Sequence, residues 1–320
     1  MKQFWKDLAF SCIMGLIIPG MILSVGVAMF GKEVPETEPT VTQIVQLKQD
    51  PVIPVLTKQG VREMGLNEYL TGVVLAEMPA SFEPEAHKAQ AVVARTYTMR
   101  AHLGKSKHDQ ASVCTDSACC QGYISPEDYI AKGGTEVTIQ KIRNAVLDTD
   151  AFVLTYDGEL IEATYFSCSG GTTEDAVAVW GTDVPYLQSV ASPGEEGATH
   201  YTDTVTFSSD EFKERLSIES RVEASHWIGK VTYTAGGGVD TILIAGKQFR
   251  GTEIRKLLGL RSTAFEIRWE HGTFTVTTRG YGHRVGMSQY GADAMAASGS
   301  GFEEILAHYY QGTVLEQLDD

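Results

Sequence analysis

Residues 66–102 read LNEYLTGVVLAEMPASFEPEAHKAQAVVARTYTMRAH, and this stretch predicts two helices joined by a short loop. Residues 66–77 carry apolar side chains at helical spacing, and the Met78-Pro79 pair ends the run. Residues 84–102 begin with proline, which suits the first turn of a helix, and continue with many alanines. A pair of neighbouring helices is therefore expected near the start of the folded part of the chain.

Outward from the helix pair, strand-like and helical patterns occur in separate stretches. The Asp157-Gly158 pair predicts a hairpin turn between strands at residues 152–156 and 161–165. The remaining expectations are a strand at 51–57, strands within 227–241 and 242–244 around Gly236-Gly237-Gly238, a hairpin at 265–278, and helices at 208–216, 251–258, 287–297 and 302–310. Because helices and strands are segregated rather than alternating, we predict an α+β fold whose helical and β-rich segments form two lobes around a groove.

Residues 8–30 contain no charged side chain, and at about 1.5 Å per residue a helix over them would span roughly 34 Å, enough for a bilayer. Lys2 and Lys6 precede this stretch, while Glu33 and Glu36 follow it. The positive-inside rule then places the N-terminus in the cytoplasm. We expect a retained anchor, with a cleaved signal peptide as the alternative, since small residues near the end of the stretch could form a cleavage site.

The predicted organisation has four parts. These are a cytoplasmic N-terminus at 1–7, a single transmembrane anchor at 8–30, a polar linker with prolines at 31–50, and an extracytoplasmic domain at 51–320. The expected location is the cytoplasmic membrane, with the folded domain on its outer side.

Composition excludes two classes of protein. The formal net charge is −15 and no stripe of Lys and Arg is visible, which argues against a nucleic-acid binder. Five cysteines are too few to build a disulfide scaffold in a chain of 320 residues.

Glu77 is the first candidate for chemistry. It stands at the end of a mostly apolar helix, where a carboxyl group is partly desolvated and its proton affinity rises, as is typical of a general acid. A lone helical Glu is more often a solvated surface residue. The second helix adds Lys88 and Arg95, seven positions apart and hence on one face, followed by Tyr97.

Several ordered blocks of the chain resemble the signatures of the stage II sporulation protein D family. The opening blocks are NEYLTGVVLAEMP at 67–79 and AHKAQAVVARTY at 86–97. The middle block is YFSCSGG at 165–171, and the closing block is RGYGHRVGMSQYGA at 279–292. Ordered blocks spread over residues 60–315 are far more specific than one short motif.

The resemblance implies a lytic transglycosylase that cuts the glycan strands of peptidoglycan and prefers strands without stem peptides. The family's catalytic Glu falls on Glu77, and its important basic residue falls on Arg95. Hydrolytic glycosidases commonly need two carboxylates. A transglycosylase can use one, because its nucleophile is the C6 hydroxyl of the muramic sugar and the product is a 1,6-anhydro end. Arg95 is expected to pair with the lactyl carboxylate of a peptide-free muramic acid or to hold Glu77 in place.

Two loops are expected to supply sugar contacts. The small residues at 167–171 let backbone approach a sugar closely, and polar residues follow the glycines of the closing block. The expected substrate contacts are Lys88, Tyr97, Ser167, Ser169, Gly170, Gly171, His283, Ser288, Gln289 and Tyr290. A structural role for His283 is an equal alternative. We expect Glu77, Arg95, residues 167–171 and Gln289 to line one glycan groove.

The second candidate site is a cluster of potential metal ligands, which are His108, Cys114, Cys119 and Cys120. Tetrahedral zinc takes thiolate and imidazole ligands, so these residues predict a structural zinc site, although their spacing is not that of a zinc finger. Some members of the family carry such a cluster and hold zinc there. A disulfide among these cysteines, perhaps with Cys168, is the alternative.

The resemblance also implies partners and leaves a second function open. The family works with an amidase and a polytopic membrane protein during engulfment in sporulation. A related group stimulates an amidase without cutting glycan, so a glycan-binding enhancer is the alternative to an enzyme. A catalytic zinc hydrolase is not expected, because four clustered ligands leave no open metal position.

Overall fold

The structure is a computed structural model that describes residues 50–318. The predicted cytoplasmic N-terminus, the predicted anchor and all but the last residue of the predicted linker lie outside the described residues. Within 50–318, no helix has both the length and the apolar character needed to cross a bilayer.

The helix pair expected from residues 66–102 is present. The helices of the described part are α1 (Leu66–Glu77), α2 (Pro84–Arg100), α3 (Pro126–Ala131), α4 (Glu136–Asp148), α5 (Ala176–Trp180), α6 (Ser209–Leu216), α7 (Gly251–Leu258), α8 (Gln289–Ala297) and α9 (Phe302–Tyr309). A π-helical turn, Ala101–Lys105, follows α2, and a 3-10 turn, Ala224–His226, precedes β8. The predicted helices are thus confirmed, with shifts of one to two residues at α2, α6, α8 and α9.

The strands form several small sheets. They are β1 (Val52–Thr57), β2 (Gly60–Gly65), β3 (Val113–Cys114), β4 (Phe152–Tyr156), β5 (Glu159–Leu160), β6 (Tyr165–Phe166), β7 (Thr202–Ser208), β8 (Ile228–Tyr233), β9 (Val239–Ile244), β10 (Lys247–Arg250), β11 (Ala264–Glu270), β12 (Thr273–Arg279), β13 (Met287–Ser288) and β14 (Val314–Gln317). The sheet orders are β2-β1-β3, β10-β9-β8, β11-β12-β7, β13-β6 and β14-β4-β5. This mixture confirms the α+β class.

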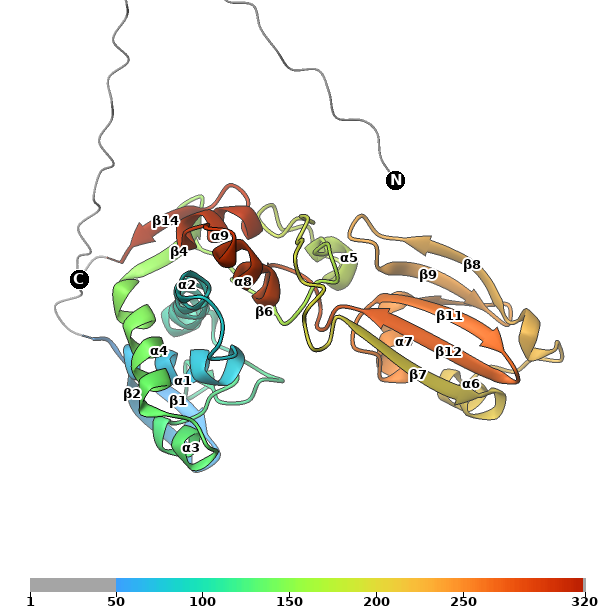
Figure 1. Ribbon diagram of the computed structural model, residues 1–320, viewed down its shortest axis with the longest axis horizontal. Coiled ribbons are helices and arrows are strands. Elements are labelled where there is room, and N and C mark those ends of the chain that lie inside the picture. The colour runs from blue at the N-terminus through green and yellow to red at the C-terminus, as the bar shows by residue number, and fades with distance from the viewer. Residues whose placement is uncertain (1–49, 319–320) are drawn as a thin grey trace, which may run out of the picture. The chain divides into compact units, whose positions relative to one another are not determined.

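Helix α2 is the centre of the helical region, where it contacts α1, α4, α8, α9 and β4 (Figure 1). Its two faces join different apolar clusters. Ala86, Ala89 and Val93 pack with α8, α9 and β4, while Ala91 and Ala94 pack with α1, α4 and β1. Small side chains let the surrounding elements approach the α2 backbone closely, which is why an alanine-rich helix is buried here.

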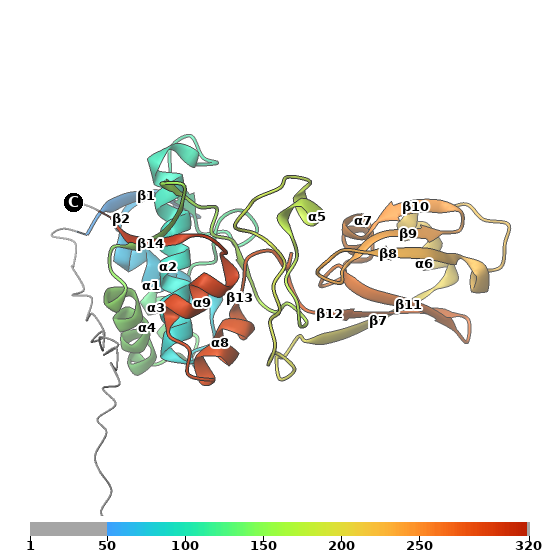
Figure 2. The same ribbon diagram turned by 90° about the horizontal axis from the view of Figure 1, so that it is seen from above.

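A third apolar cluster holds the β-rich stretch 202–279 together. Figure 2 shows β7, β11 and β12 side by side, with the β8-β9-β10 sheet as a second layer. Phe212 of α6 and Ile254 of α7 are fully buried in this cluster, and Phe274 of β12 stacks on Phe212 with ring centroids 4.0 Å apart. The predicted division of the molecule into two lobes stays a prediction, because separate apolar clusters do not by themselves define lobes.

One expected strand is wrong, and helices α3, α4 and α5 were not predicted. The predicted strand at 161–165 is wrong, because the backbone donors there are used otherwise: the Glu162 N–H bonds the Tyr186 hydroxyl, and the Thr164 N–H bonds the Glu162 carbonyl. Helix α4 was not predicted, although Thr135 caps its start and Ile139, Ile142 and Val146 follow at helical spacing.

Candidate active site

One pocket of about 860 Å³ brings together residues from all of the blocks that resemble the family. Helix α1 contributes its last residue, and the loop around residues 117–121 and the segment 162–167 form further walls. Of the predicted site residues, those that line it are Glu77, Tyr97, Ser167, His283, Gln289, Cys119 and Cys120. Distant parts of the chain therefore meet around the Glu77 carboxyl group.

The Glu77 carboxyl group is half-buried and anchored. Its Oε1 accepts a hydrogen bond of 2.6 Å from the Gly122 N–H. Burial raises the pKa of Glu77, while hydrogen bonds from Gly122, Tyr165 and Gln289 lower it without cancelling the rise. A carboxyl group in this setting keeps a proton at higher pH than a solvated one, which suits a general acid.

Tyr165 and Gln121 are site residues that the sequence reasoning did not assign. The Tyr165 hydroxyl donates to Gln121 Oε1 at 3.3 Å, and Gln121 Nε2 donates to Thr98 Oγ1 at 3.0 Å. Burial, and then the nearby Glu77, raises the pKa of Tyr165 well above its ordinary value, so its hydroxyl stays protonated. Tyr165 opens the YFSCSGG block, but only the tertiary structure reveals that it faces Glu77.

The parallel pairing of β6 with β13 explains how the middle and closing blocks meet. Met287 lies opposite Tyr165, and Ser288 lies opposite Phe166. Gln289, the next residue, begins α8 beside the pocket and also donates to Gln90 Oε1 at 3.5 Å. The short strand pair thus delivers two hydrogen-bonding partners to the same carboxyl group.

A second hollow of about 750 Å³ also has Glu77 in its wall. Glu77 and Ser117 line both hollows. The second one is otherwise lined by α1, by α3 and by the loops that flank α3, with Tyr123, Tyr129 and Lys132 among its side chains. The same glutamate is therefore a wall residue of two hollows.

Arg95 is not part of this pocket, which corrects the expectation that it contacts sugar or Glu77. Its side chain is fully buried and donates to the carbonyl oxygens of Thr149, at 2.6 Å, and Val146, at 2.9 Å. These carbonyls belong to the C-terminal end of α4, which attracts cations. Arg95 therefore holds α4 against α2, and burial lowers its pKa to about 10 against the opposing effects of Asp150 and Asp50.

Lys88 also lies outside the pocket. Its Nζ pairs with Glu85 at 2.9 Å and with Asp148 at 3.6 Å, on the α2 and α4 surface. Tyr97, by contrast, does line the pocket, and its hydroxyl accepts a hydrogen bond of 3.3 Å from Lys107 Nζ.

The loop of Ser169, Gly170 and Gly171 binds a protein carboxylate instead of lining the pocket. Ser169 donates from both N and Oγ to Glu195 Oε2, each at 2.8 Å, and the Gly170 N–H donates at 2.9 Å. Gly170 has φ +78°, and a side chain there would meet the Gly280 backbone. Gly170 is thus required by packing, while Gly171 has φ +113° and open space beside it. Neither glycine lines the pocket of Glu77, which corrects their assignment as sugar contacts there.

Ser288 and Tyr290 have structural partners as well. Ser288 caps α8 and donates to Glu195 Oε1, while the Tyr290 ring packs edge-on against Phe82 at 4.9 Å between centroids. Neither side chain lines the pocket of Glu77.

His283 lines the pocket but is held among aromatic rings. Its ring lies 5.6 Å from that of Phe166 and 5.5 Å from that of Trp180, between centroids. Burial, and then the nearby Arg255, lowers the pKa of His283 to about 4, so the imidazole is neutral near pH 7. This geometry favours a wall-forming role over proton transfer.

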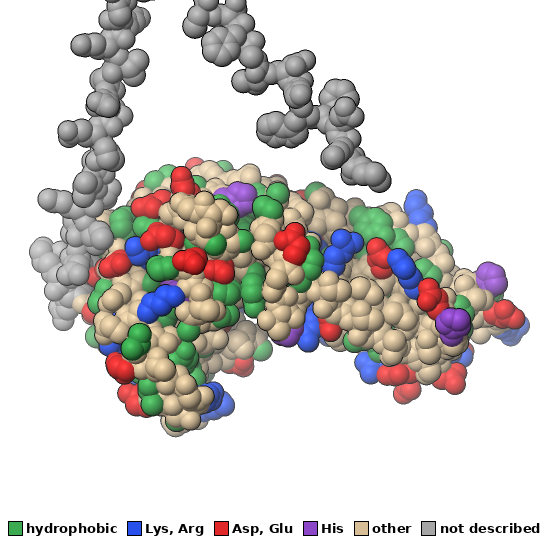
Figure 3. Space-filling view, viewed as in Figure 1, with side chains coloured by type: hydrophobic (Ala, Val, Ile, Leu, Met, Phe, Trp, Pro, Cys, Tyr) green, Lys and Arg blue, Asp and Glu red, His purple; other side chains and the backbone are tan. Residues whose placement is uncertain are grey.

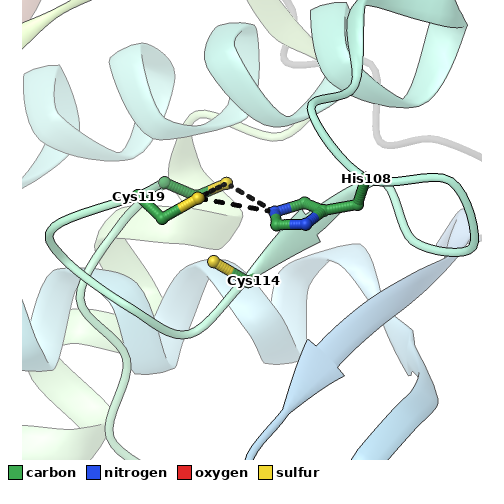
Figure 4. A group of neighbouring side chains, drawn as sticks. His108, Cys114 and Cys119 are labelled. Atoms are coloured by element: carbon green, nitrogen blue, oxygen red, sulfur yellow. Dashed lines mark hydrogen bonds between the residues drawn. The ribbon is translucent and has the colours of Figure 1, made fainter.

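The predicted metal ligands do converge. Figure 4 shows His108, Cys114 and Cys119 pointing toward one another, Cys114 from β3 and the others from loops. The ligand atoms of these residues and Cys120 lie within 4.8 Å of one another, and His108 Nε2 is 3.3 Å from Cys120 Sγ and 3.7 Å from Cys119 Sγ. Zn–S bonds of about 2.3 Å in a tetrahedron give sulfur atoms about 3.8 Å apart, so this donor set fits zinc.

The cysteines within residues 50–318 are all free thiols. Burial raises the pKa of the Cys114 thiol to about 12, and the neighbouring Cys120 and Cys119 add to the rise. Cys168 lies outside the cluster, where its buried Sγ contacts Glu195 Oε2 at 3.3 Å.

Charge on the surface is mixed. On the face that Figure 3 shows, Lys and Arg side chains are scattered among Asp and Glu side chains and do not form a stripe. The chemistry is concentrated in the pocket, where a proton-retaining carboxyl group meets neutral hydrogen-bonding and aromatic side chains. Fold and site together define an α+β protein equipped to bind a polar ligand and to exchange a proton with it.

Comparison with known proteins identifies the family. A sequence model of the family described as "Stage II sporulation protein" matches residues 57–156. A stage II sporulation protein D of Bacillus subtilis (strain 168) is 40% identical over 335 residues, covering 100% of this chain and 97% of that protein. One of Bacillus amyloliquefaciens is 40% identical over 296 residues, covering 90% and 84%. The chain belongs to the stage II sporulation protein D family, as its blocks predicted.

A more distant relative has a different name. The amidase enhancer of Bacillus subtilis (strain 168) is 30% identical over 300 residues, which is 77% of this chain and 40% of that protein. The chain is thus a sporulation protein of the stage II D family that is related to an amidase enhancer.

Proposed function

We propose that this protein is a lytic transglycosylase that cleaves peptide-free glycan strands of peptidoglycan during engulfment in sporulation. The observation that carries the proposal is the Glu77 carboxyl group, whose pKa is raised by burial and which lines two hollows. A glycan strand could extend through both hollows and place one glycosidic bond at Glu77.

The proposed reaction needs a single carboxyl group. Protonated Glu77 donates its proton to the bridging glycosidic oxygen as the bond to C1 of the muramic sugar breaks. The C6 hydroxyl oxygen of the same sugar then bonds to C1, and its proton returns to the Glu77 carboxylate. No water is consumed, and the product ends in a 1,6-anhydro sugar.

Hydrogen bonds around Glu77 would orient it through both steps. Gly122 holds one oxygen, and the Tyr165 and Gln289 side chains lie close enough to the carboxyl group to lower its pKa. His283 and Trp180 line the same pocket and would offer ring faces to sugar.

The test is mass spectrometry of products formed from peptide-free glycan strands by the full-length protein in detergent. We expect 1,6-anhydro ends with the native protein and a loss of at least about a hundredfold with Glu77→Gln, since acid and base catalysis by one group contributes about 10²–10⁴. Glu162 is the matched control, because this carboxylate lines the same pocket and lies 3.8 Å from Arg100. Reducing ends formed by added water, together with activity lost in Glu162→Gln, would instead indicate a two-carboxylate hydrolase.

The relation to an amidase enhancer supports a second candidate function. A non-catalytic enhancer would bind glycan and speed a partner amidase. Intact strands with both the native protein and Glu77→Gln, accompanied by faster amidase action, would establish this role instead.

We also propose a structural zinc ion at His108, Cys114, Cys119 and Cys120, whose ligand atoms lie close enough to surround one ion. Bound zinc would join the loop that carries Cys119 and Cys120 to β3. That loop forms part of the pocket wall, so the ion's contribution would be to the shape of the site.

The proposed location is the outer side of the cytoplasmic membrane, with residues 8–30 as the anchor and residues 51–320 as the extracytoplasmic domain. Partners would be an amidase that removes stem peptides and a polytopic membrane protein of the engulfment machinery. Protease added to intact protoplasts should degrade the domain, whereas protection of the domain would contradict this orientation.

A further inference from the structure

The pocket of Glu77 has an uneven charge distribution. Among the described residues that line it, Glu77 and Glu162 are acidic, and Lys107 is the sole Lys or Arg. An anionic ligand in this pocket would meet the two carboxyl groups unless it approached Lys107.

Lys107 is fixed at the rim by two hydrogen bonds. Its Nζ donates to the Cys119 carbonyl oxygen at 3.0 Å and to the Tyr97 hydroxyl at 3.3 Å, and it lies 5.8 Å from the centre of the Tyr97 ring. An ammonium group has three N–H donors, so one remains for a ligand. The loop and the ring thus hold a cation beside the space that a sugar would occupy.

At the lactyl group of each muramic acid, peptide-free glycan carries one negative charge that peptide-bearing glycan lacks. In the peptide-bearing strand the lactyl group of muramic acid forms an amide, which is neutral. Removal of the stem peptide leaves a carboxylate in its place. A cation near the lactyl group would therefore favour peptide-free strands, and Arg95 cannot supply it because its side chain is fully buried.

We propose that Lys107 binds the lactyl carboxylate of a muramic acid residue and thereby selects strands from which the stem peptide has been removed. The inference rests on the proposed function, since it assumes that glycan occupies this pocket. Lys107 is exposed to solvent, so the preference it creates should be modest, about two- to fivefold in affinity for one ion pair.

The experiment measures binding without cleavage. Full-length Glu77→Gln protein in detergent is titrated calorimetrically with peptide-free strands and with the same strands after their lactyl carboxylates have been converted to methylamides. We expect tighter binding to the charged strands, by about two- to fivefold at low salt, and a smaller difference as ionic strength screens the pair.

Two variants at Lys107 and one control separate the possibilities. Lys107→Gln should abolish the preference without weakening binding to the methylamide strands, and Lys107→Arg should retain it. Lys105→Gln removes the same charge two positions earlier, at the end of the π-helical turn, from a residue that does not line the pocket, and it should keep the preference. Melting temperatures of all variants are compared first, so that unfolding is not mistaken for lost recognition.

The outcomes distinguish this inference from the proposed function. Binding of both strands with no preference, or a preference that survives in Lys107→Gln, would overturn the role of Lys107 and leave the glycan pocket standing. If Lys105→Gln lost the preference for charged strands as fully as Lys107→Gln, the role of Lys107 would also be overturned, because general surface charge would then explain the preference. If neither strand binds, the glycan-cleaving function itself fails, and the role of Lys107 fails with it.

Discussion

At the scale of single residues, the chemistry depends on how one carboxyl group is surrounded. Glu77 is anchored by a backbone N–H and lies within hydrogen-bonding reach of two polar side chains, while burial raises its pKa. Burial and the hydrogen-bonding partners shift the pKa of Glu77 in opposite directions. Removing one partner should therefore shift this pKa, and with it the pH dependence of activity.

The Tyr165 hydroxyl provides a direct test of this balance. It lowers the pKa of Glu77, so Tyr165→Phe should raise that pKa. Because the general acid must be protonated in the free enzyme, activity falls as pH rises through its pKa. The alkaline limb of the kcat/KM profile should therefore move to higher pH in Tyr165→Phe.

Tyr97→Phe is the matched control, because the Tyr97 hydroxyl lies in the same pocket but is not among the partners of Glu77. Its alkaline limb should stay in place. A limb that moves to lower pH in Tyr165→Phe would show that the hydroxyl stabilises the protonated form instead.

At the scale of elements, Arg95 explains how α4 is held. Its guanidinium binds carbonyl oxygens at the end of α4 from a fully buried position on α2. Arg95→Met should lower the free energy of unfolding by about 3 kcal/mol, since carbonyl groups lose their buried partner. Chemical denaturation measures this value.

Lys88→Gln is the control on the same pair of helices. Its ion pairs with Glu85 and Asp148 are partly exposed, so the change should cost about 1 kcal/mol or less. If Arg95→Met kept full stability and lost glycan cleavage alone, Arg95 would have a functional role that its position does not suggest.

The histidine–cysteine cluster of His108, Cys114, Cys119 and Cys120 gives a second prediction at the scale of elements. With free zinc at about a hundred times its dissociation constant, binding to the folded state should add about 2.7 kcal/mol, or roughly 5–10 °C in melting temperature. A chelator should remove this increment from the native protein, and Cys119→Ser should lower the metal content measured by mass spectrometry.

Cys168→Ser should leave the metal content unchanged, because Cys168 lies outside the cluster. A native protein that contains no zinc and whose melting temperature rises with oxidant would favour a disulfide in the cluster.

At the scale of the whole molecule, a buried ion pair joins distant segments. Arg284 Nη1 lies 3.0 Å from Glu174 Oε1, and both side chains are almost fully buried. The other guanidinium nitrogens bind the carbonyl oxygens of Ser169, Thr172 and Gly236. The closing block, the middle block and the turn between β8 and β9 are thus held at one point.

Removal of one partner should be costly at this point. Glu174→Gln leaves the Arg284 charge buried without its carboxylate, so it should lower the free energy of unfolding by about 3 kcal/mol. Glu266→Gln removes an exposed partner of Arg268 and Arg279. This control should change the free energy of unfolding by less than about 1 kcal/mol. Equal effects in the two variants, measured by urea denaturation, would contradict the role of the buried pair.

The glycines in the turn between β8 and β9 are required because this turn packs against Glu174 and Thr173. A side-chain carbon on Gly238 would lie 2.3 Å from Glu174 Oε1, and one on Gly236 would lie 2.2 Å from the Thr173 carbonyl oxygen. The sequence places these glycines among strand-like runs, but their partner, Glu174, is visible only in the folded molecule.

Local patterns in the sequence determined the helix pair, the hairpins, the α+β class, the family and the candidates Glu77 and the histidine–cysteine cluster. These features follow from spacing along the chain, because helical periodicity, turn residues and neighbouring ligands act over a few positions. The tertiary structure decided which side chains share a pocket. It buried Arg95 beneath α4, directed Ser169 and Gly170 to Glu195, and brought Tyr165 to Glu77. Such contacts depend on packing between segments far apart in the chain, and no local pattern encodes them.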